Sequence, residues 1–167
     1  MELMIESAGS DRITIALDLL YKAAVWLKDK NIDYWQNWLD PLNEHIAWIR
    51  QGFDNGEFYF VYNNESIIMG MYRLQYRDEM FWGEQNDKSG YIHSFTTNRD
   101  FKGNGIGYHI LRMIEEKLLE QGFDYLRLDC SPDIRGLCKY YENYGFEPKE
   151  TIIACGEKLK LYEKKIS

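Results

Sequence analysis

A strand, a glycine-rich loop, an amphipathic helix and a second strand follow one another over residues 91–130, and this succession constrains the fold most. The segment 91–97 is rich in aromatic and β-branched residues, and residues 125–130 alternate between apolar and polar side chains, as strands do. Apolar residues at helical spacing predict a helix over residues 105–120, ended by Gly122. A strand–helix–strand connection of this kind forms a right-handed crossover between parallel strands. The fold must therefore contain a parallel pair.

The rest of the chain predicts hairpins and helices around this unit. The further strands are expected at residues 3–6, 58–62, 66–74, 151–155 and 159–165, and the further helices at about 11–27, 43–51 and 134–144. Hairpins make neighbouring strands antiparallel, so the crossover strands join a mixed sheet. The expected fold class is α+β, in α/β/α layers, with a mixed, largely antiparallel central sheet of about seven strands flanked by helices.

Local signals also predict helix ends and two irregular segments. Ser10 or Asp11 is expected to cap the first helix, and Gly52 to end the second. Residues 31–42 lack clean periodicity and are expected to form an irregular aromatic loop, and residues 77–90 a polar loop.

Length and composition predict one soluble domain over residues 1–167. The net charge is −7, no basic run occurs, and nucleic acid is therefore a poor candidate partner. No secretory signal or membrane-spanning stretch is evident. We therefore expect a cytoplasmic location and no membrane partner. The three cysteines lack C-x-x-C spacing, which predicts neither a disulfide framework nor a metal site. A homodimer remains compatible with these features.

The loop at residues 102–107 carries the clearest chemical signal. Glycines at 103, 105 and 107 stand between a strand and a helix. Glycine permits positive φ and close approach of a ligand, and the amides at a helix N-terminus bind anions such as a pyrophosphate. Neither the dinucleotide pattern G-x-G-x-x-G nor the P-loop ending G-K-[ST] is present. The alternative is a tight strand-to-helix turn without a ligand.

Two motifs in this region resemble the GNAT family of N-acetyltransferases. Residues 102–107, K-G-N-G-I-G, are similar to the family signature R/Q-x-x-G-x-G/A, with Lys102 in place of Arg or Gln. Residues 140–146, Y-Y-E-N-Y-G-F, match the family's Y-E-x-x-G-F pattern at the end of the last helix. The resemblance extends over residues 91–146. It implies a GNAT-like acyl-CoA N-acyltransferase fold and transfer of an acetyl group from acetyl-CoA to a primary amine of a small molecule or an amino terminus.

The resemblance also implies roles for individual residues. In the family, the amine attacks the thioester directly, and Tyr141 aligns with the tyrosine that protonates the departing thiolate. Ile134 stands seven residues earlier, where members often have an asparagine that bonds the pantetheine. The implied cofactor contacts are the strand residues Phe95, Thr96 and Thr97 along the pantetheine, and Lys102, Gly103, Asn104, Gly105, Ile106 and Gly107 at the pyrophosphate.

The general base and the acceptor pocket are less constrained. His93 has a near-neutral intrinsic pKa and lies on the strand that leads to the loop, so it is a candidate base. Alternation would place His93, Phe95 and Thr97 on one face of that strand. The alternatives are that His93 only packs, or that Asp129 or a water chain removes the proton.

Aromatic residues of the two irregular segments are candidates for the amine pocket, because a cation binds well over an aromatic face. These candidates are Trp35, Trp38 and Trp82. An equal alternative is that Trp35 and Trp38 close the core. At the level of function, the alternatives are a non-catalytic acyl-CoA-binding or sensing module of the same fold, and an interaction domain whose aromatic loop binds protein.

Overall fold

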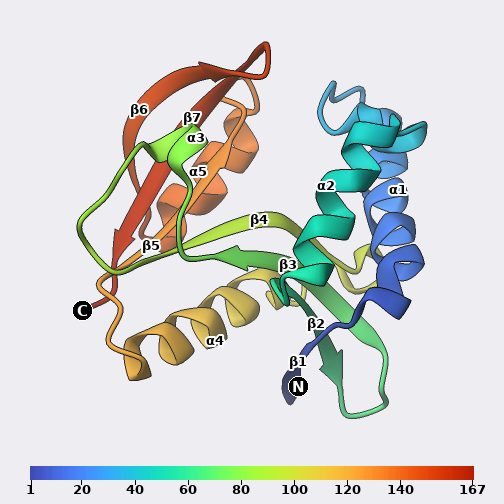
Figure 1. The fold of residues 1–167 in the computed structure, drawn as a ribbon. Coiled ribbons are helices and arrows are strands. Elements are labelled where there is room, and N and C mark those ends of the chain that lie inside the picture. Colours follow the sequence, from blue (N-terminus) through green and yellow to red (C-terminus); the bar gives the residue numbers. More distant parts are fainter. The chain divides into compact units, whose positions relative to one another are not determined.

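All seven strands belong to one sheet, in the order β1-β2-β3-β4-β5-β7-β6 (Figure 1). The computed structural model describes residues 1–167. The strands are β1 (Leu3–Ser7), β2 (Phe58–Asn63), β3 (Ile68–Gln75), β4 (Ser89–Thr97), β5 (Tyr125–Cys130), β6 (Glu147–Ala154) and β7 (Glu157–Lys165). The helices are α1 (Ile13–Asp29), α2 (Asn43–Asp54), α3 (Glu79–Trp82), α4 (Ile106–Glu120) and α5 (Arg135–Tyr144).

The pairing of the strands confirms the predicted fold class. β4 pairs with β5 in parallel, and α4 forms the crossover between them. The pairs β1–β2, β2–β3, β5–β7 and β6–β7 are antiparallel. The mixed sheet therefore contains the parallel pair that the strand–helix–strand succession requires.

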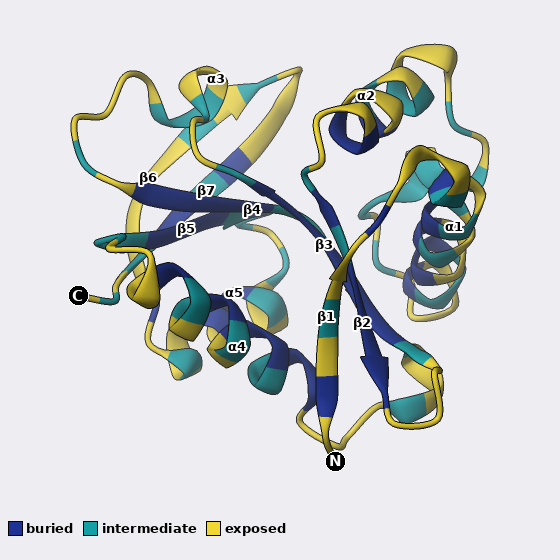
Figure 2. Cartoon of the chain, turned by 60° about the horizontal axis from the view of Figure 1, so that its bottom comes forward, coloured by how far each residue is buried: buried dark blue, intermediate teal, exposed yellow.

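The chain divides into two compact units. The first unit consists of Met1–Arg73 and Ser94–Ile110, and the second of Leu74–His93 and Leu111–Ser167. In the first unit, α1 and α2 lie side by side and turn their buried stripes inward (Figures 1 and 2). The core of this unit joins Leu20 of α1 and Phe53 of α2 to Phe58 and Phe60 of β2. Phe53 and Phe58 stack with ring centroids 4.4 Å apart.

The predicted start of the first helix and the predicted end of the second helix are both wrong. α1 begins at Ile13 after a 3-10 turn at Ser10–Arg12, and neither polar side chain of that turn caps it. α2 continues through Gly52 to Asp54. A Cβ at Gly52 would lie 2.4 Å from the Phe58 ring and 2.8 Å from the Arg73 side chain. Gly52 therefore allows close packing inside the helix and does not end it.

The buried Arg127 organises the second unit. Its guanidinium pairs with both carboxylate oxygens of Asp87 at 2.8 Å and with Glu163 of β7 at 2.7 Å, and it donates to the Tyr91 hydroxyl at 2.9 Å. It therefore ties the segment before β4 to β5 and β7. That segment was predicted as a loop throughout, but it contains the short helix α3, in which the Phe81 amide donates to the Asp78 side chain.

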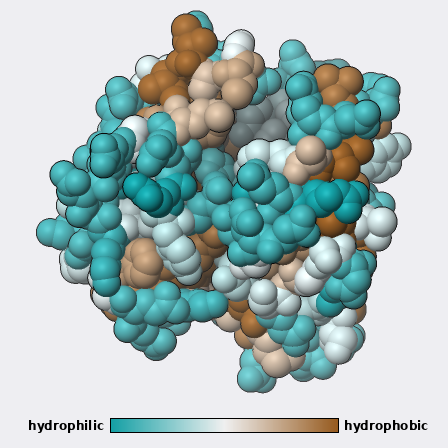
Figure 3. All heavy atoms as spheres, in the orientation of Figure 1, coloured by the Kyte–Doolittle hydropathy of each residue, from teal (hydrophilic) through white to brown (hydrophobic).

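Hydrophilic residues cover most of the face seen in Figure 3. Among the exposed apolar side chains are Met80 of α3 and Ile153 near the β6–β7 turn. None of the helices is long and apolar enough to cross a membrane.

Candidate active site

The glycine-rich loop of the first unit has the backbone geometry of an anion cradle. Gly103 and Gly105 have φ values of 83° and 68°, which L residues rarely adopt, and a Cβ built on either would meet no atom within 4 Å. These glycines thus satisfy a backbone requirement and leave open space beside the main chain. The Gly105 carbonyl accepts from the His109 amide at 3.0 Å, so α4 begins here. Amides of a first helical turn have no acceptor within their own helix and are available to an anion.

The residues around the loop also suit a diphosphate. Lys102 is exposed and supplies a positive charge, and residues 103–105 are exposed as well. Asn98 anchors the entry to the loop: its amide donates to Met69 O at 2.8 Å and its side chain donates to Ile68 O at 2.9 Å. Residues 102–107 therefore fit the pyrophosphate of coenzyme A.

The regular alternation expected along β4 is interrupted at Ser94, which has a φ of 51° in the middle of the strand. A left-handed residue at such a position is typical of a β-bulge, which interrupts the regular succession of side chains. Thr96 is 5% exposed and its carbonyl approaches Gly70 of β3, whereas Phe95 and Thr97 are only partly buried. His93 and Phe95 therefore cannot be assigned to one face by counting.

The β4–β5 ladder in the second unit is short. It joins Ser89–Tyr91 to Tyr125–Arg127 and then stops, although β5 continues to pair with β7 as far as Cys130. His93 and Asp129 both lie beyond the last paired residues. The end of the ladder thus places two titratable side chains where the two strands no longer exchange hydrogen bonds.

His93 lies between two carboxylates. Its Nε2 is 3.0 Å from Asp78 Oδ2, and its Nδ1 is 3.9 Å from Asp129 Oδ2. The side chains of His93, Asp78 and Asp129 are 12%, 8% and 12% exposed. The second oxygen of Asp78 accepts from the Phe81 amide at 3.3 Å and caps α3. We call these three residues the base cluster.

Asp129 has a perturbed pKa. Burial is the main cause that raises this pKa to about 6; the charge of His93 opposes the shift, and the charge of Asp78 adds to it. Their ligand atoms lie within 4.8 Å of one another, so the three side chains could also hold a metal ion. The sequence predicted no metal site and did not single out Asp78, which lies fifteen residues before His93 without any motif.

Tyr141 is the tyrosine of α5 that points into the second unit. It is buried, and its ring contacts those of Phe146 and Tyr162 at 5.8 and 6.3 Å. Tyr144 instead donates to Glu115 at 2.6 Å, and burial with this contact raises the pKa of Tyr144. Ile134 stands at the N-cap of α5 and supplies no side-chain hydrogen bond.

The three candidate tryptophans do not gather in one unit. Trp35 and Trp38 pack against the core of the first unit, and Trp35 stacks on Tyr34 at 5.6 Å. This packing agrees with the alternative that Trp35 and Trp38 close the core. Trp82 belongs to the second unit, where its ring lies 5.0 Å from the Arg127 guanidinium and its buried indole nitrogen has no hydrogen-bond partner.

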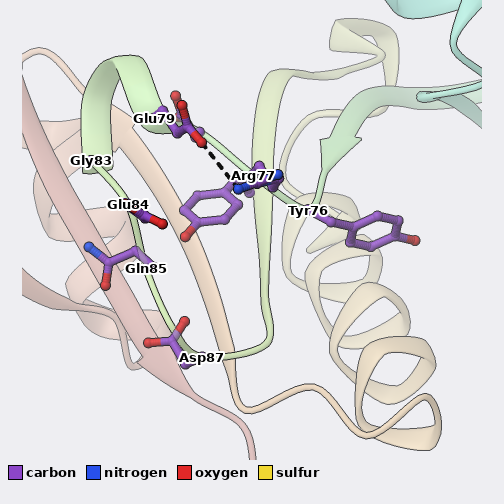
Figure 4. Close-up of a pocket in the computed structure, with 9 residues that line it drawn as sticks. Tyr76, Arg77, Glu79, Gly83, Glu84, Gln85 and Asp87 are labelled. Atoms are coloured by element: carbon purple, nitrogen blue, oxygen red, sulfur yellow. Dashed lines mark ion pairs between the residues drawn. The ribbon is translucent and has the colours of Figure 1, made fainter.

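The segment before β4 forms a small acidic pocket (Figure 4). In Figure 4, Glu79 and Arg77 face each other in an ion pair of 3.3 Å, whereas the Tyr76 ring points away. The cavity holds about 20 Å³, roughly the space of one water. Its acidic lining residues are Asp78, Glu79, Glu84 and Asp87. A substrate does not fit inside, but the rim is acidic.

Comparison with known proteins decides the family. A family model described as the acetyltransferase (GNAT) family matches residues 19–146. The chain belongs to the GNAT acetyltransferase family. The N-acetyltransferase YesJ of Bacillus subtilis (strain 168) is 26% identical over 133 residues, which cover 77% of this chain and 73% of YesJ.

Solved GNAT structures share the fold. A GNAT acetyltransferase from Listeria monocytogenes 4b F2365 superposes with a TM-score of 0.80 at 21% identity, covering 99% of this chain and 95% of its own. The aminoglycoside acetyltransferase AAC(6′)-Ib in complex with ribostamycin and coenzyme A gives a TM-score of 0.75 at 16% identity, covering 99% of this chain and 94% of its own.

Membership identifies the activity. This GNAT protein is an N-acetyltransferase that takes its acetyl group from acetyl-CoA. The alternative of a non-catalytic binding module is not favoured. Acetyl-CoA supplies the reactive thioester when bound.

Proposed function

We propose that this GNAT enzyme acetylates a primary amine of a small, cationic molecule, with His93 as general base and Tyr141 as general acid. Residues 102–107 would hold the pyrophosphate of acetyl-CoA, and the backbone of Phe95, Thr96 and Thr97 would run along the pantetheine. The observation that carries the proposal is the exposed, left-handed glycine backbone at the start of α4, which suits a diphosphate.

The acidic segment before β4 supports a cationic acceptor. Glu79 and Glu84 line the pocket drawn in Figure 4, and the base cluster adds two further carboxylates. Negative charge around a site raises the local concentration of cations. AAC(6′)-Ib was solved with ribostamycin, an observation on a structural neighbour that agrees with this class of acceptor. Trp82 is the tryptophan that we assign to the acceptor side, whereas Trp35 and Trp38 serve the core.

Direct transfer requires one residue that removes a proton from the amine and another that donates a proton to the leaving sulfur. The amine nitrogen forms a bond to the thioester carbonyl carbon, and the bond from that carbon to sulfur breaks. His93 takes the proton that the nitrogen loses, and Tyr141 gives a proton to the leaving sulfur. No enzyme nucleophile is required, and burial raises the pKa of the Cys130 thiol, which keeps it protonated.

The substitution Tyr141→Phe tests the acid role. It removes one hydroxyl and keeps the ring packing, so turnover should fall about 10²-fold while the affinity for coenzyme A stays the same. Thiol release from acetyl-CoA measures turnover with a panel of polyamines, aminoglycosides and amino-acid amides. Calorimetry measures coenzyme A binding.

The matched control is Tyr140→Phe, which removes a hydroxyl from the neighbouring, partly exposed tyrosine of the same helix. It should behave as the wild type. Equal turnover in Tyr141→Phe and the wild type would remove Tyr141 from the mechanism. Coenzyme A binding without thiol release for every amine would contradict the proposed acceptor class.

A further inference from the structure

The base cluster has the composition of a metal site. It brings together one imidazole and two carboxylates, from the segment before β4, from β4 and from β5. Their ligand atoms all lie within 4.8 Å of one another, and the three side chains are only 8–12% exposed. Imidazole and carboxylate ligands suit divalent transition metals such as Zn²⁺. The imidazole and the burial distinguish this cluster from an exposed group of acidic residues.

Asp129 is the member of the cluster that lacks a strong partner. Its carboxylate accepts no hydrogen bond from the protein, and its separation of 3.9 Å from His93 Nδ1 is too long for one. The negative charge of Asp78 lies nearby as well and opposes the ionisation of Asp129. A carboxylate that is 12% exposed and lies beside another one is costly unless a cation compensates it. The cluster therefore favours a positive ion at its centre.

The distances inside the cluster also suit an ion. Two ligands with bonds of about 2.0–2.1 Å to one metal lie roughly 3 Å apart when the bonds are nearly perpendicular. Nε2 of His93 and Oδ2 of Asp78 are 3.0 Å apart, so an ion can take the place of the hydrogen atom between them with little movement. Asp129 has to approach by roughly 1 Å to complete the set, and no hydrogen bond holds its carboxylate back.

Phe81 of α3 supports two of the three ligands. Its amide donates to Oδ1 of Asp78 at 3.3 Å, and its ring lies 5.8 Å from the imidazole of His93. Hydrogen bonds to the non-coordinating atoms orient metal ligands, and apolar groups around them limit the access of water. Phe81 supplies both kinds of support, so Asp78 and His93 are held in place before an ion arrives.

We propose that Asp78, His93 and Asp129 bind one divalent transition-metal ion, Zn²⁺ or an ion of similar ligand preference, and that this ion inhibits acetyl transfer. The ion coordinates the imidazole that removes the proton of the amine in the proposed function, so a loaded cluster has no base to offer. Its positive charge also repels a cationic acceptor. Metal binding is independent of the proposed function, whereas the inhibition rests on it.

Isothermal calorimetry with ZnCl₂ tests the site in the variant Cys155→Ser, which lacks the exposed thiol that itself binds Zn²⁺. We expect one ion per chain. Adding Asp129→Asn or His93→Gln should weaken binding at least about 100-fold, because each removes one of three ligands. The matched control Asp133→Asn changes an exposed aspartate just beyond β5 and should bind as before. Equal affinities in Asp129→Asn and Asp133→Asn overturn the proposal.

Cobalt spectroscopy identifies the ligands. Co²⁺ bound to nitrogen and oxygen absorbs visible light through its d–d transitions, whereas thiolate ligands add an intense charge-transfer band in the near ultraviolet. The alternative ligands are Cys130 and Cys138, whose sulfur atoms are 3.8 Å apart. We expect d–d bands without the charge-transfer band, and the loss of these bands in Asp129→Asn. A charge-transfer band would assign the ion to the cysteines and overturn the proposal.

Inhibition is measured by mass spectrometry of the acetylated amine, because Zn²⁺ binds the released thiol. In the Cys155→Ser background, saturating Zn²⁺ should lower turnover at least about 100-fold, and a chelator should restore it. The residual activity of Asp129→Asn should need at least about 100-fold more Zn²⁺ for half-inhibition, whereas Asp133→Asn should stay as sensitive as its background. Equal sensitivity of Asp129→Asn, or activation by Zn²⁺, overturns the proposal.

These results separate the inference from the proposed function. If an amine is acetylated and Zn²⁺ does not bind the cluster, only the inference fails. If no amine is acetylated, the proposed function fails, and calorimetry and the cobalt spectra still decide whether the cluster binds a metal.

Discussion

The glycine-rich loop and the base cluster are built by opposite means. The loop, residues 102–107, is contiguous in the sequence and offers exposed main chain with no side chain in the way. The base cluster takes Asp78, His93 and Asp129 from a loop and two strands, and its side chains are nearly buried. A site made of main chain should lose its ligand when an added Cβ blocks the approach. A site made of side chains should lose its geometry when the residues that hold those side chains are replaced.

The largest expected effect is at Gly105. Gly105→Val places a branched side chain in the open space beside the loop and penalises a φ of 68°. Coenzyme A affinity should fall about 10³-fold or more, because phosphate oxygens can no longer approach the amides. Isothermal calorimetry with coenzyme A measures the loss.

Gly56→Val provides a matched control in the same unit. Gly56 has a φ of 70° and also has no atom within 4 Å of a built Cβ, so the backbone strain is the same. Both variants should lose similar unfolding free energy, about 1–3 kcal/mol. If coenzyme A affinity falls equally in both, strain explains the loss and residues 102–107 are not the cradle.

The same contrast explains how much the sequence could predict. The loop was predictable because one contiguous stretch contains its glycines and the start of α4. Asp78 was not, because its contact with His93 depends on how the segment before β4 folds back, and α3 was missed there. Ser94 broke the alternation through its backbone, and no side-chain pattern signals such a bulge. The crossover strands, whose patterns repeat over many residues, were predicted with the correct pairing.

The next effect in size concerns Arg127, which joins the segment before β4 to β5 and β7. Arg127→Met keeps much of the side-chain volume but leaves Asp87 and Glu163 without their shared partner. Breaking a buried ion pair in this way typically costs about 3–5 kcal/mol of unfolding free energy. Urea denaturation measures this cost, and coenzyme A affinity of the folded variant should stay close to that of the wild type.

Arg77→Met is the exposed counterpart. Arg77 pairs with Glu79 at 3.3 Å, but both side chains are largely exposed, so the unfolding free energy should hardly change. Similar losses in both variants would mean that Arg127 is not the anchor of this segment. A large loss of coenzyme A affinity in Arg127→Met would show that the two sites are not built independently.

The smallest expected effect concerns Asp129, whose ionised form lowers the unfolding free energy of the protein. The pKa of Asp129 rises from 3.8 in the unfolded chain to about 6 in the folded protein, chiefly through burial. The folded state therefore binds the proton of Asp129 more tightly than the unfolded chain does. Protonated Asp129 stabilises the fold fully below pH 3.8, and this stabilisation is lost as the pH rises through 6. The amide side chain in the variant Asp129→Asn does not ionise, so the variant keeps this stability at every pH. Its unfolding free energy should exceed that of the wild type by about 1–3 kcal/mol at pH 7.5, and by less at pH 4.5.

Thermal unfolding at the two pH values measures this difference, and an advantage that is independent of pH would contradict it. Gly105→Val is the opposite case, since it should lower both the unfolding free energy and the affinity for coenzyme A. Burial of Asp129 thus lowers the stability of the folded protein at neutral pH, which is typical of a carboxylate that is kept for function rather than for folding.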